Sequence, residues 1–123
     1  ATNVAGLPGN GVSGKGYSQL SSPTDIAVDS DGTMYILDSG NYRVMKWLRD
    51  EPLGFRVAGN ESSGSALNQI AHSYDLYLDN DGNIYISEYG NHRVSKWLKG
   101  NTSAGIVVSN TQLTYEAPCN VGR

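Results

Sequence analysis

Short segments in which apolar and polar residues alternate follow one another along the central part of the chain. The first four are DIAVD (25–29), TMYILD (33–38), YRVMKWL (42–48) and FRVAG (55–59), with turn-forming residues between them. Alternation of this kind, rich in Val, Ile, Tyr and Trp and broken by Asp-Gly and Gly-Asn pairs, is typical of β-hairpins. No segment has convincing apolar spacing at 3.6 residues. The pattern predicts an antiparallel meander of four strands.

The same order of segments returns fifty residues later, as DLYLD (75–79), NIYISE (83–88), HRVSKWL (92–98) and GIVVS (105–109). Residues 20–59, aligned without a gap on residues 70–109, are identical at fourteen of forty positions. A fixed period of this length indicates a repeat architecture, in which one unit cannot bury its own apolar surface and packs on its neighbours.

The two ends of the chain extend the repetition. TNVAG (2–6) is similar to FRVAG and GIVVS, so residues 1–6 are expected to be the outer strand of a preceding unit. The segments GYSQLSSP (16–23) and ALNQIAHS (66–73) correspond to each other as lead-ins to a first strand. Residues 110–123 are interpreted as the degenerate start of a third repeat or as a tail.

The strings resemble the NHL-repeat β-propellers. The second copy carries LYLDNDGNIYISEYGNHRVSKW with Asn91-His92-Arg93 at its centre, and the first carries Asn41-Tyr42-Arg43. The resemblance implies an all-β fold of four-stranded antiparallel propeller blades, with two complete blades, at 24–59 and 74–109, and an orphan N-terminal outer strand. The family's Gly before the first strand is replaced here by Asp25 and Asp75, which we interpret as structural drift.

The turns between strands carry residues suited to unusual backbone angles. Gly32 and Gly82 are expected to take positive φ, which glycine adopts at little steric cost. Asn41 and Asn91 are expected in the left-handed region, which asparagine tolerates better than most residues.

A carboxylate stands five residues before an arginine in each copy, as Asp38 before Arg43 and Glu88 before Arg93. This spacing places the two groups across one hairpin, where an ion pair can fix its shape.

Composition and charge narrow the possible functions. The net charge is −3, the sequence pI is about 5.2, and the nine basic residues are dispersed, so a nucleic-acid surface is not expected. No apolar run approaches the roughly 20 residues that span a bilayer. The single cysteine, Cys119, excludes an internal disulfide; in a secreted protein it predicts a bridge to another chain, and otherwise it is an unpaired side chain.

The Asp-x-Asp-Gly turns that begin at Asp29 and Asp79 faintly resemble a calcium loop. That loop needs a bidentate Glu eleven residues after its first Asp, where this chain has Gly40 and Gly90. We therefore interpret both segments as plain hairpin turns.

The two histidines, His72 and His92, are too few for a three-histidine zinc site in one chain. His92 is expected to pack near its hairpin, and His72 lies in a loop. Cys119 has no evident histidine partner for nucleophilic chemistry. The sequence thus predicts no catalytic, cofactor-binding or metal-binding residues, and no enzyme.

Two Asn-x-Ser sequences, at Asn60 and Asn101, match the acceptor pattern for N-linked glycans. Chance alone predicts about two such matches for this composition, so their number is uninformative. Both, however, fall in expected loops between strands, where a glycan could be carried. We therefore expect a secreted, extracellular protein with glycans at Asn60 and Asn101.

Two blades alone would leave one sheet face open at each end of the stack. We therefore predict a non-enzymatic extracellular interaction module that joins copies of itself, head to tail, into a ring or a filament; the other partner considered is further blades of a longer chain. One alternative is a fragment of a propeller enzyme, of lyase or lactone hydrolase type, with its channel site on other blades. Another is a propeller that recognises protein or RNA.

Overall fold

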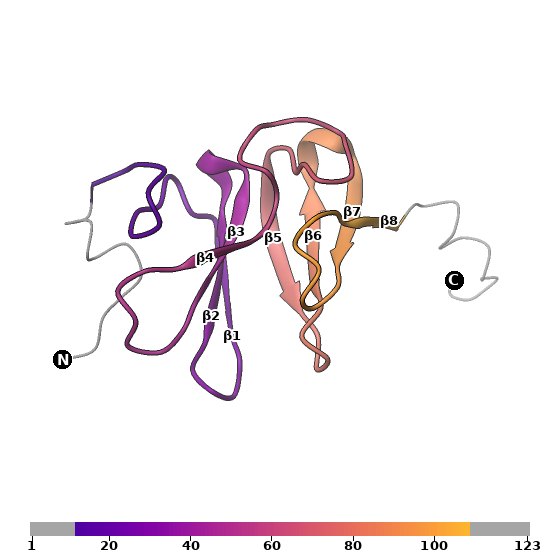
Figure 1. Cartoon of the computed structure of the whole chain (residues 1–123). Coiled ribbons are helices and arrows are strands. Elements are labelled where there is room, and N and C mark those ends of the chain that lie inside the picture. Colours follow the sequence, from indigo (N-terminus) through magenta and orange to yellow (C-terminus); the bar gives the residue numbers. More distant parts are fainter. Residues whose placement is uncertain (1–11, 109–123) are drawn as a thin grey trace.

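A computed structural model describes residues 12–108 as two four-stranded antiparallel sheets that lie side by side (Figure 1). Each sheet is a meander, with its strands in sequence order, and we refer to the sheets as blade 1 and blade 2. Blade 1 consists of β1 (Asp25–Val28), β2 (Met34–Asp38), β3 (Arg43–Trp47) and β4 (Phe55–Ala58). Blade 2 consists of β5 (Ser73–Leu78), β6 (Ile84–Glu88), β7 (Arg93–Trp97) and β8 (Ile106–Val108).

The predicted all-β fold of four-stranded antiparallel blades is confirmed for the described residues. The expected orphan strand at 1–6 and the residues 110–123 lie outside the described part of the chain. The only helices within residues 12–108 are the 3-10 turns η2 (Ser39–Asn41) and η3 (Tyr89–Asn91), and none is long enough to cross a membrane.

The glycine turns follow the prediction, and the asparagine turns do not. Gly32 and Gly82 have φ of 84° and 86°. The left-handed residues after η2 and η3 are Tyr42 and His92, each with φ of 53°, rather than the preceding asparagines. The expectation was wrong because each asparagine places its side-chain amide as a hydrogen-bond donor inside the hairpin, and the chain reverses one residue later.

The main core lies in the seam where blade 1 packs against blade 2. Side chains alternate along each strand, so one face of each sheet points into the seam. Blade 1 contributes Tyr35, Leu37, Val44 and Ala58. Blade 2 contributes Leu76, Ile84, Ile86 and Trp97. The other face of blade 1 holds a smaller cluster of Ile36, Met45 and Trp47.

Candidate functional site

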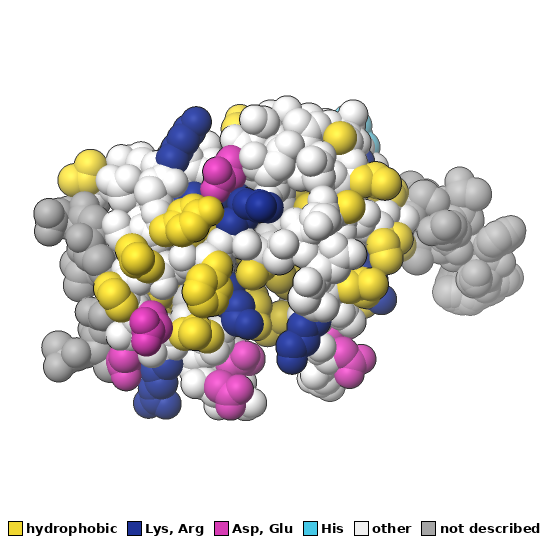
Figure 2. All heavy atoms as spheres, viewed as in Figure 1, with side chains coloured by type: hydrophobic (Ala, Val, Ile, Leu, Met, Phe, Trp, Pro, Cys, Tyr) yellow, Lys and Arg dark blue, Asp and Glu magenta, His cyan; other side chains and the backbone are white. Residues whose placement is uncertain are grey.

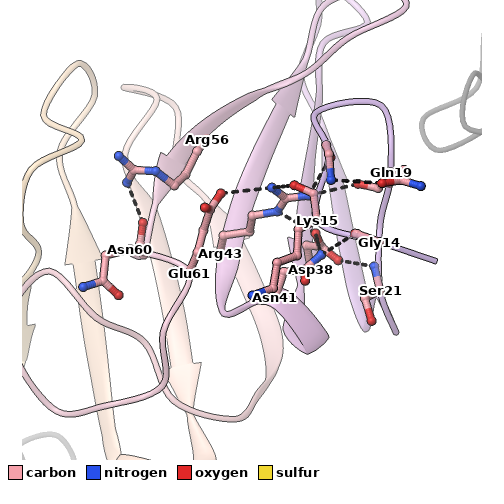
Figure 3. A network of polar contacts seen from close by, with 12 residues as sticks. Gly14, Lys15, Gln19, Ser21, Asp38, Asn41, Arg43, Arg56, Asn60 and Glu61 are labelled. Atoms are coloured by element: carbon pink, nitrogen blue, oxygen red, sulfur yellow. Dashed lines mark hydrogen bonds and ion pairs between the residues drawn. The ribbon is translucent and has the colours of Figure 1, made fainter.

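A buried arginine closes the hairpin of blade 1 (Figure 3). The Nε atom of Arg43 donates to Asp38 Oδ2 at 2.7 Å, and one terminal nitrogen donates to Glu61 Oε2 at 3.0 Å. The remaining bonds go to backbone carbonyls of the lead-in loop, at Lys15, Gly16 and Gln19. Both Arg43 and Asp38 are fully buried, so these contacts replace the water that the two charges lose.

Blade 2 repeats this clamp fifty residues later, as the hairpin spacing predicted. Arg93 donates through Nε to Glu88 Oε1 at 3.0 Å and through its terminal nitrogens to the carbonyls of Ser65, Ala66 and Gln69. The Asn-x-Arg sequence therefore fastens each hairpin to the loop that leads into its own blade.

The second clamp is less complete than the first. The side chain of Arg93 is 12% exposed, whereas that of Arg43 is fully buried. Glu88 Oε2 is buried and has no hydrogen-bond partner among the described residues. Glu61, which completes the first clamp, comes from the chain after β4; sequence reasoning missed it, because no local spacing relates it to Arg43.

Polar contacts cross the seam beside the apolar core. Asp25 Oδ2 accepts the backbone N–H of Leu76 at 2.9 Å. The hydroxyls of Thr24 and Ser39 both donate to the carbonyl of Ser73. Asp25, interpreted from the sequence as structural drift, thus holds the first strand of the next blade through its carboxylate.

The open face of blade 1 is apolar and partly uncovered. Ile26 and Val28 are 51% and 58% exposed on it. A hollow of about 410 Å³ is lined there by Ile26, Met34 and Ile36, together with Leu20. The residues fifty positions later on blade 2, such as Leu76, Ile84 and Ile86, are buried in the seam. This face is thus the counterpart of a surface that already receives a blade.

The open face of blade 2 is more polar than the corresponding face of blade 1, which lies in the seam. Buried Leu37 of the seam corresponds to exposed Ser87, and half-buried Ala27 corresponds to Tyr77, which is 65% exposed. Tyr77 lies beside the ring of Tyr85, at 5.9 Å between centroids. This face keeps the backbone geometry of a seam surface but fewer of its apolar side chains.

Aromatic rings line the η3 end of blade 2. His72 and Tyr74 meet edge to face, with 4.8 Å between ring centroids. The ring of Tyr89 lies 5.8 Å from that of Tyr74 and 6.5 Å from that of His92. His92 is exposed, and its ring lies 6.5 Å from that of Tyr89 in the same hairpin turn. Its left-handed backbone turns the ring outwards, while the neighbouring Asn91 and Arg93 occupy the inside of the hairpin.

A search against models of known families matches the NHL repeat at residues 20–47 and 75–97. The chain carries two NHL repeats. The first matched segment contains β1, β2 and β3, the second contains β5 from residue 75 onwards with β6 and β7, and both include the Asn-x-Arg sequence. NHL repeats generally form non-catalytic interaction modules, and the two sheets are blades of the propeller type. No curated protein matches the chain.

Both predicted glycan acceptors of the NHL blades are exposed. Asn60 follows β4, and its Oδ1 atom accepts the backbone N–H of Ser62 at 3.0 Å. Asn101 lies in the loop before β8, and its Oδ1 atom accepts the backbone N–H of Ser103 at 3.1 Å. Cys119 lies outside the described residues.

The aspartate turns are hairpin caps. Asp29 Oδ1 accepts the backbone N–H groups of Asp31 and Thr33. Asp79 repeats this pattern and also accepts bonds from the side chains of Asn83 and Tyr85. The hydrogen bond from the backbone of Asn83 is the main cause that lowers the pKa of Asp79 below 3.8. Between residues 12 and 108, no three His, Cys, Asp or Glu side chains form a group that could hold a metal.

Proposed function

We propose that this NHL-repeat chain is a non-enzymatic, extracellular interaction module whose open faces pack against copies of the same chain. In this assembly the open face of blade 2 of one copy lies on the open face of blade 1 of the next. Such head-to-tail contacts are heterologous, so they give a ring if the rotation closes and a filament if it does not.

One observation carries the proposal: the two open faces are the fifty-residue counterparts of the two surfaces that meet in the seam. Ile26 corresponds to Leu76, and Asp75 corresponds to Asp25. In the seam, Asp25 Oδ2 binds the N–H of Leu76. In the proposed assembly, the carboxylate of Asp75 of one copy accepts the backbone N–H of Ile26 of the next copy. In the single chain, this N–H donates to the carboxylate of Asp25.

The inter-copy contact is expected to be weaker than the seam. Apolar burial contributes about 25 cal/mol per Å², and the blade 2 face offers Ser87 where the seam has Leu37. Tyr74 and Tyr89 stand where Thr24 and Ser39 make their hydrogen bonds across the seam. The assembly is therefore expected to be reversible and dependent on concentration.

Two features support glycosylation. The acceptor sequences at Asn60 and Asn101 are exposed and lie outside the strands that form the two open faces. A glycan at either position leaves β1 and β5 uncovered. Mass spectrometry of chain expressed through a secretory pathway should find both asparagines glycosylated, with Asn60→Gln and Asn101→Gln as the controls; unmodified asparagines would contradict this part of the proposal.

Sedimentation velocity over a range of concentrations tests the assembly. The wild-type chain should form species larger than a monomer, and Ile26→Asp should abolish them, because the charge would be buried between blades. Ile26 is half exposed in the single chain, so this change leaves the fold intact.

Leu53→Asp is the matched control, since Leu53 is exposed to a similar extent, at 55%, but lies in the loop between β3 and β4. It should assemble like the wild type. A wild-type chain that stays monomeric at high micromolar concentration, or equal loss of assembly in both variants, would contradict the proposal.

A further inference from the structure

A second hollow, separate from the open faces, opens along the seam. Its volume is about 230 Å³. One wall comes from β2, β3 and β4 of blade 1, and the other comes from β6, β7 and the 98–105 loop of blade 2, with Gly82 from the turn before β6. All its walls belong to one chain, so the hollow does not depend on the assembly proposed above.

The inside of this hollow is largely apolar. Phe55 and Val57 line it from blade 1, and Ile84 and Trp97 line it from blade 2. Figure 2 shows hydrophobic side chains in the recess between the two sheets, with Lys and Arg side chains around it. Such a surface suits a small ligand with an apolar body.

Three cations surround the apolar surface, namely Lys46, Arg56 and Lys99. None of them takes part in the ion pairs found among the described residues. Lys46 Nζ lies over the ring of Tyr35, 5.7 Å from its centroid, and Arg56 donates to the carbonyl of Gly59. This arrangement leaves positive charge available to a ligand.

The indole N–H of Trp97 is buried and has no partner among the described residues, and Trp97 also lines this hollow. In blade 1, the indole N–H of Trp47 donates to the carbonyl of Glu51 at 3.0 Å. The loop after Trp97 is one residue longer than the loop after Trp47, so the carbonyl does not fall in the same place. The indole nitrogen has no surface open to the hollow and lies beside Gly105, so Trp97 lines the hollow through its ring.

The Tyr35 hydroxyl group adds a neutral donor beside the hollow. Burial, and to a lesser extent the carboxylates of Asp29 and Asp31, raise the pKa of Tyr35 above 10.0 against the opposing effect of Lys99. The phenol therefore keeps its proton at neutral pH. Asp29 and Asp31 are the acidic groups that act on Tyr35. The three cations around the hollow outnumber these two carboxylates.

We infer that the seam hollow binds a small organic carboxylate. The carboxylate group is neutralised by Lys46, Arg56 and Lys99, while the apolar body contacts Phe55, Ile84 and the ring of Trp97. The volume is below the roughly 300–1,000 Å³ of drug-sized sites, which limits the ligand to a single small ring or a short branched chain.

Nuclear magnetic resonance of the full chain tests this inference with phenylacetate as the probe. The two tryptophans give two indole N–H signals, which the spectrum of Trp47→Phe assigns. The Trp97 signal should shift saturably on titration. The Trp47 signal should remain in place, because its N–H is already bonded to Glu51.

Charge recognition is tested with a matched pair of variants. Lys99→Glu should weaken phenylacetate binding by about tenfold or more, since it reverses a charge beside the carboxylate. Arg49→Glu should bind like the wild type, because Arg49 is the blade 1 counterpart of Lys99 and does not line the hollow. Phenylacetamide, which lacks the charge, and inorganic phosphate, which lacks the apolar body, should each shift the Trp97 signal far less.

Three results would overturn the inference. The first is a Trp97 signal that does not move at millimolar phenylacetate. The second is equal binding by the Lys99→Glu and Arg49→Glu variants, which would show that the hollow does not recognise charge. The third is binding of phenylacetamide or phosphate as tight as that of phenylacetate.

Discussion

The two blades share a sequence pattern but differ in how completely their polar groups are satisfied. In both blades every nitrogen of the arginine guanidinium donates a hydrogen bond, but in blade 1 the chain beyond β4 also supplies Glu61. In blade 2, Arg93 is partly exposed, and one oxygen of Glu88 is buried without a partner among the described residues. In blade 1, the chain that follows the last strand therefore completes the clamp.

The two open faces differ in the same sense. The blade 1 face keeps the apolar side chains of a seam surface, including Ile26 and Val28, whereas the blade 2 face offers Ser87 and exposed tyrosines. An interface that was apolar on both sides would bind tightly. The polar half of this pair makes the expected contact reversible.

The largest expected effect is the loss of the first clamp. Arg43→Met should lower the free energy of unfolding by about 3–5 kcal/mol, because it leaves buried Asp38 without its counter-ion. Arg93→Met should cost less, about 1–3 kcal/mol, since water reaches this position. Urea denaturation of the two variants measures both values, and equal losses would remove the difference between the blades.

A pair of glycines separates backbone strain from crowding. Gly59 and Gly100 have φ of 80° and 82°, but a Cβ on Gly59 would lie 2.3 Å from the carbonyl oxygen of Tyr42, whereas a Cβ on Gly100 meets no atom within 4 Å. Gly100→Ala should cost only the left-handed strain, about 1–2 kcal/mol, and Gly59→Ala should cost clearly more. Thermal unfolding of both variants makes the comparison, and similar melting temperatures would contradict it.

Placing an apolar side chain on the blade 2 face should reduce the difference between the two open faces and tighten the contact between copies. Ser87→Leu adds the side chain that its counterpart Leu37 buries in the seam. Burial of a leucine contributes about 1.5–3 kcal/mol, so self-association should tighten by about tenfold or more. Sedimentation equilibrium measures this change, with Ser62→Leu, in the exposed loop after β4, as a control for non-specific adhesion.

The smallest expected effect concerns acid stability. Because hydrogen bonds lower the pKa of Asp79 in the folded state, its ionised form stabilises the fold above pH 3.8, and this contribution is lost as the pH falls further. Asp79→Asn should therefore lose slightly less stability than the wild type as the pH falls from 4 to 2. Unfolding curves at several pH values test this, and an unchanged acid dependence would contradict it.

The sequence predicts the strands and the clamps because both depend on local spacing. Alternation locates all eight strands, and the five-residue spacing from Asp38 to Arg43 indicates the ion pair. The role of Asp25 could not be predicted, because it depends on the packing of two blades. The same holds for the seam hollow, whose cations Lys46, Arg56 and Lys99 come from separate segments. The left-handed residue of each turn was predicted one position too early, because the hydrogen bonds of the Asn41 and Asn91 side chains hold these residues inside the hairpin.

The central claim is that the open face of blade 2 meets the open face of blade 1 of another copy, and cross-linking tests it most directly. Two chains that lack Cys119, by Cys119→Ser, carry Asp75→Cys and Ile26→Cys respectively. When they are mixed with a short thiol-specific cross-linker, we expect a hetero-dimer, because these positions are the counterparts of Asp25 and Leu76, which touch in the seam. Replacing Ile26→Cys by Leu53→Cys should give none, and equal yields from both mixtures, or no hetero-dimer from either, would contradict the account.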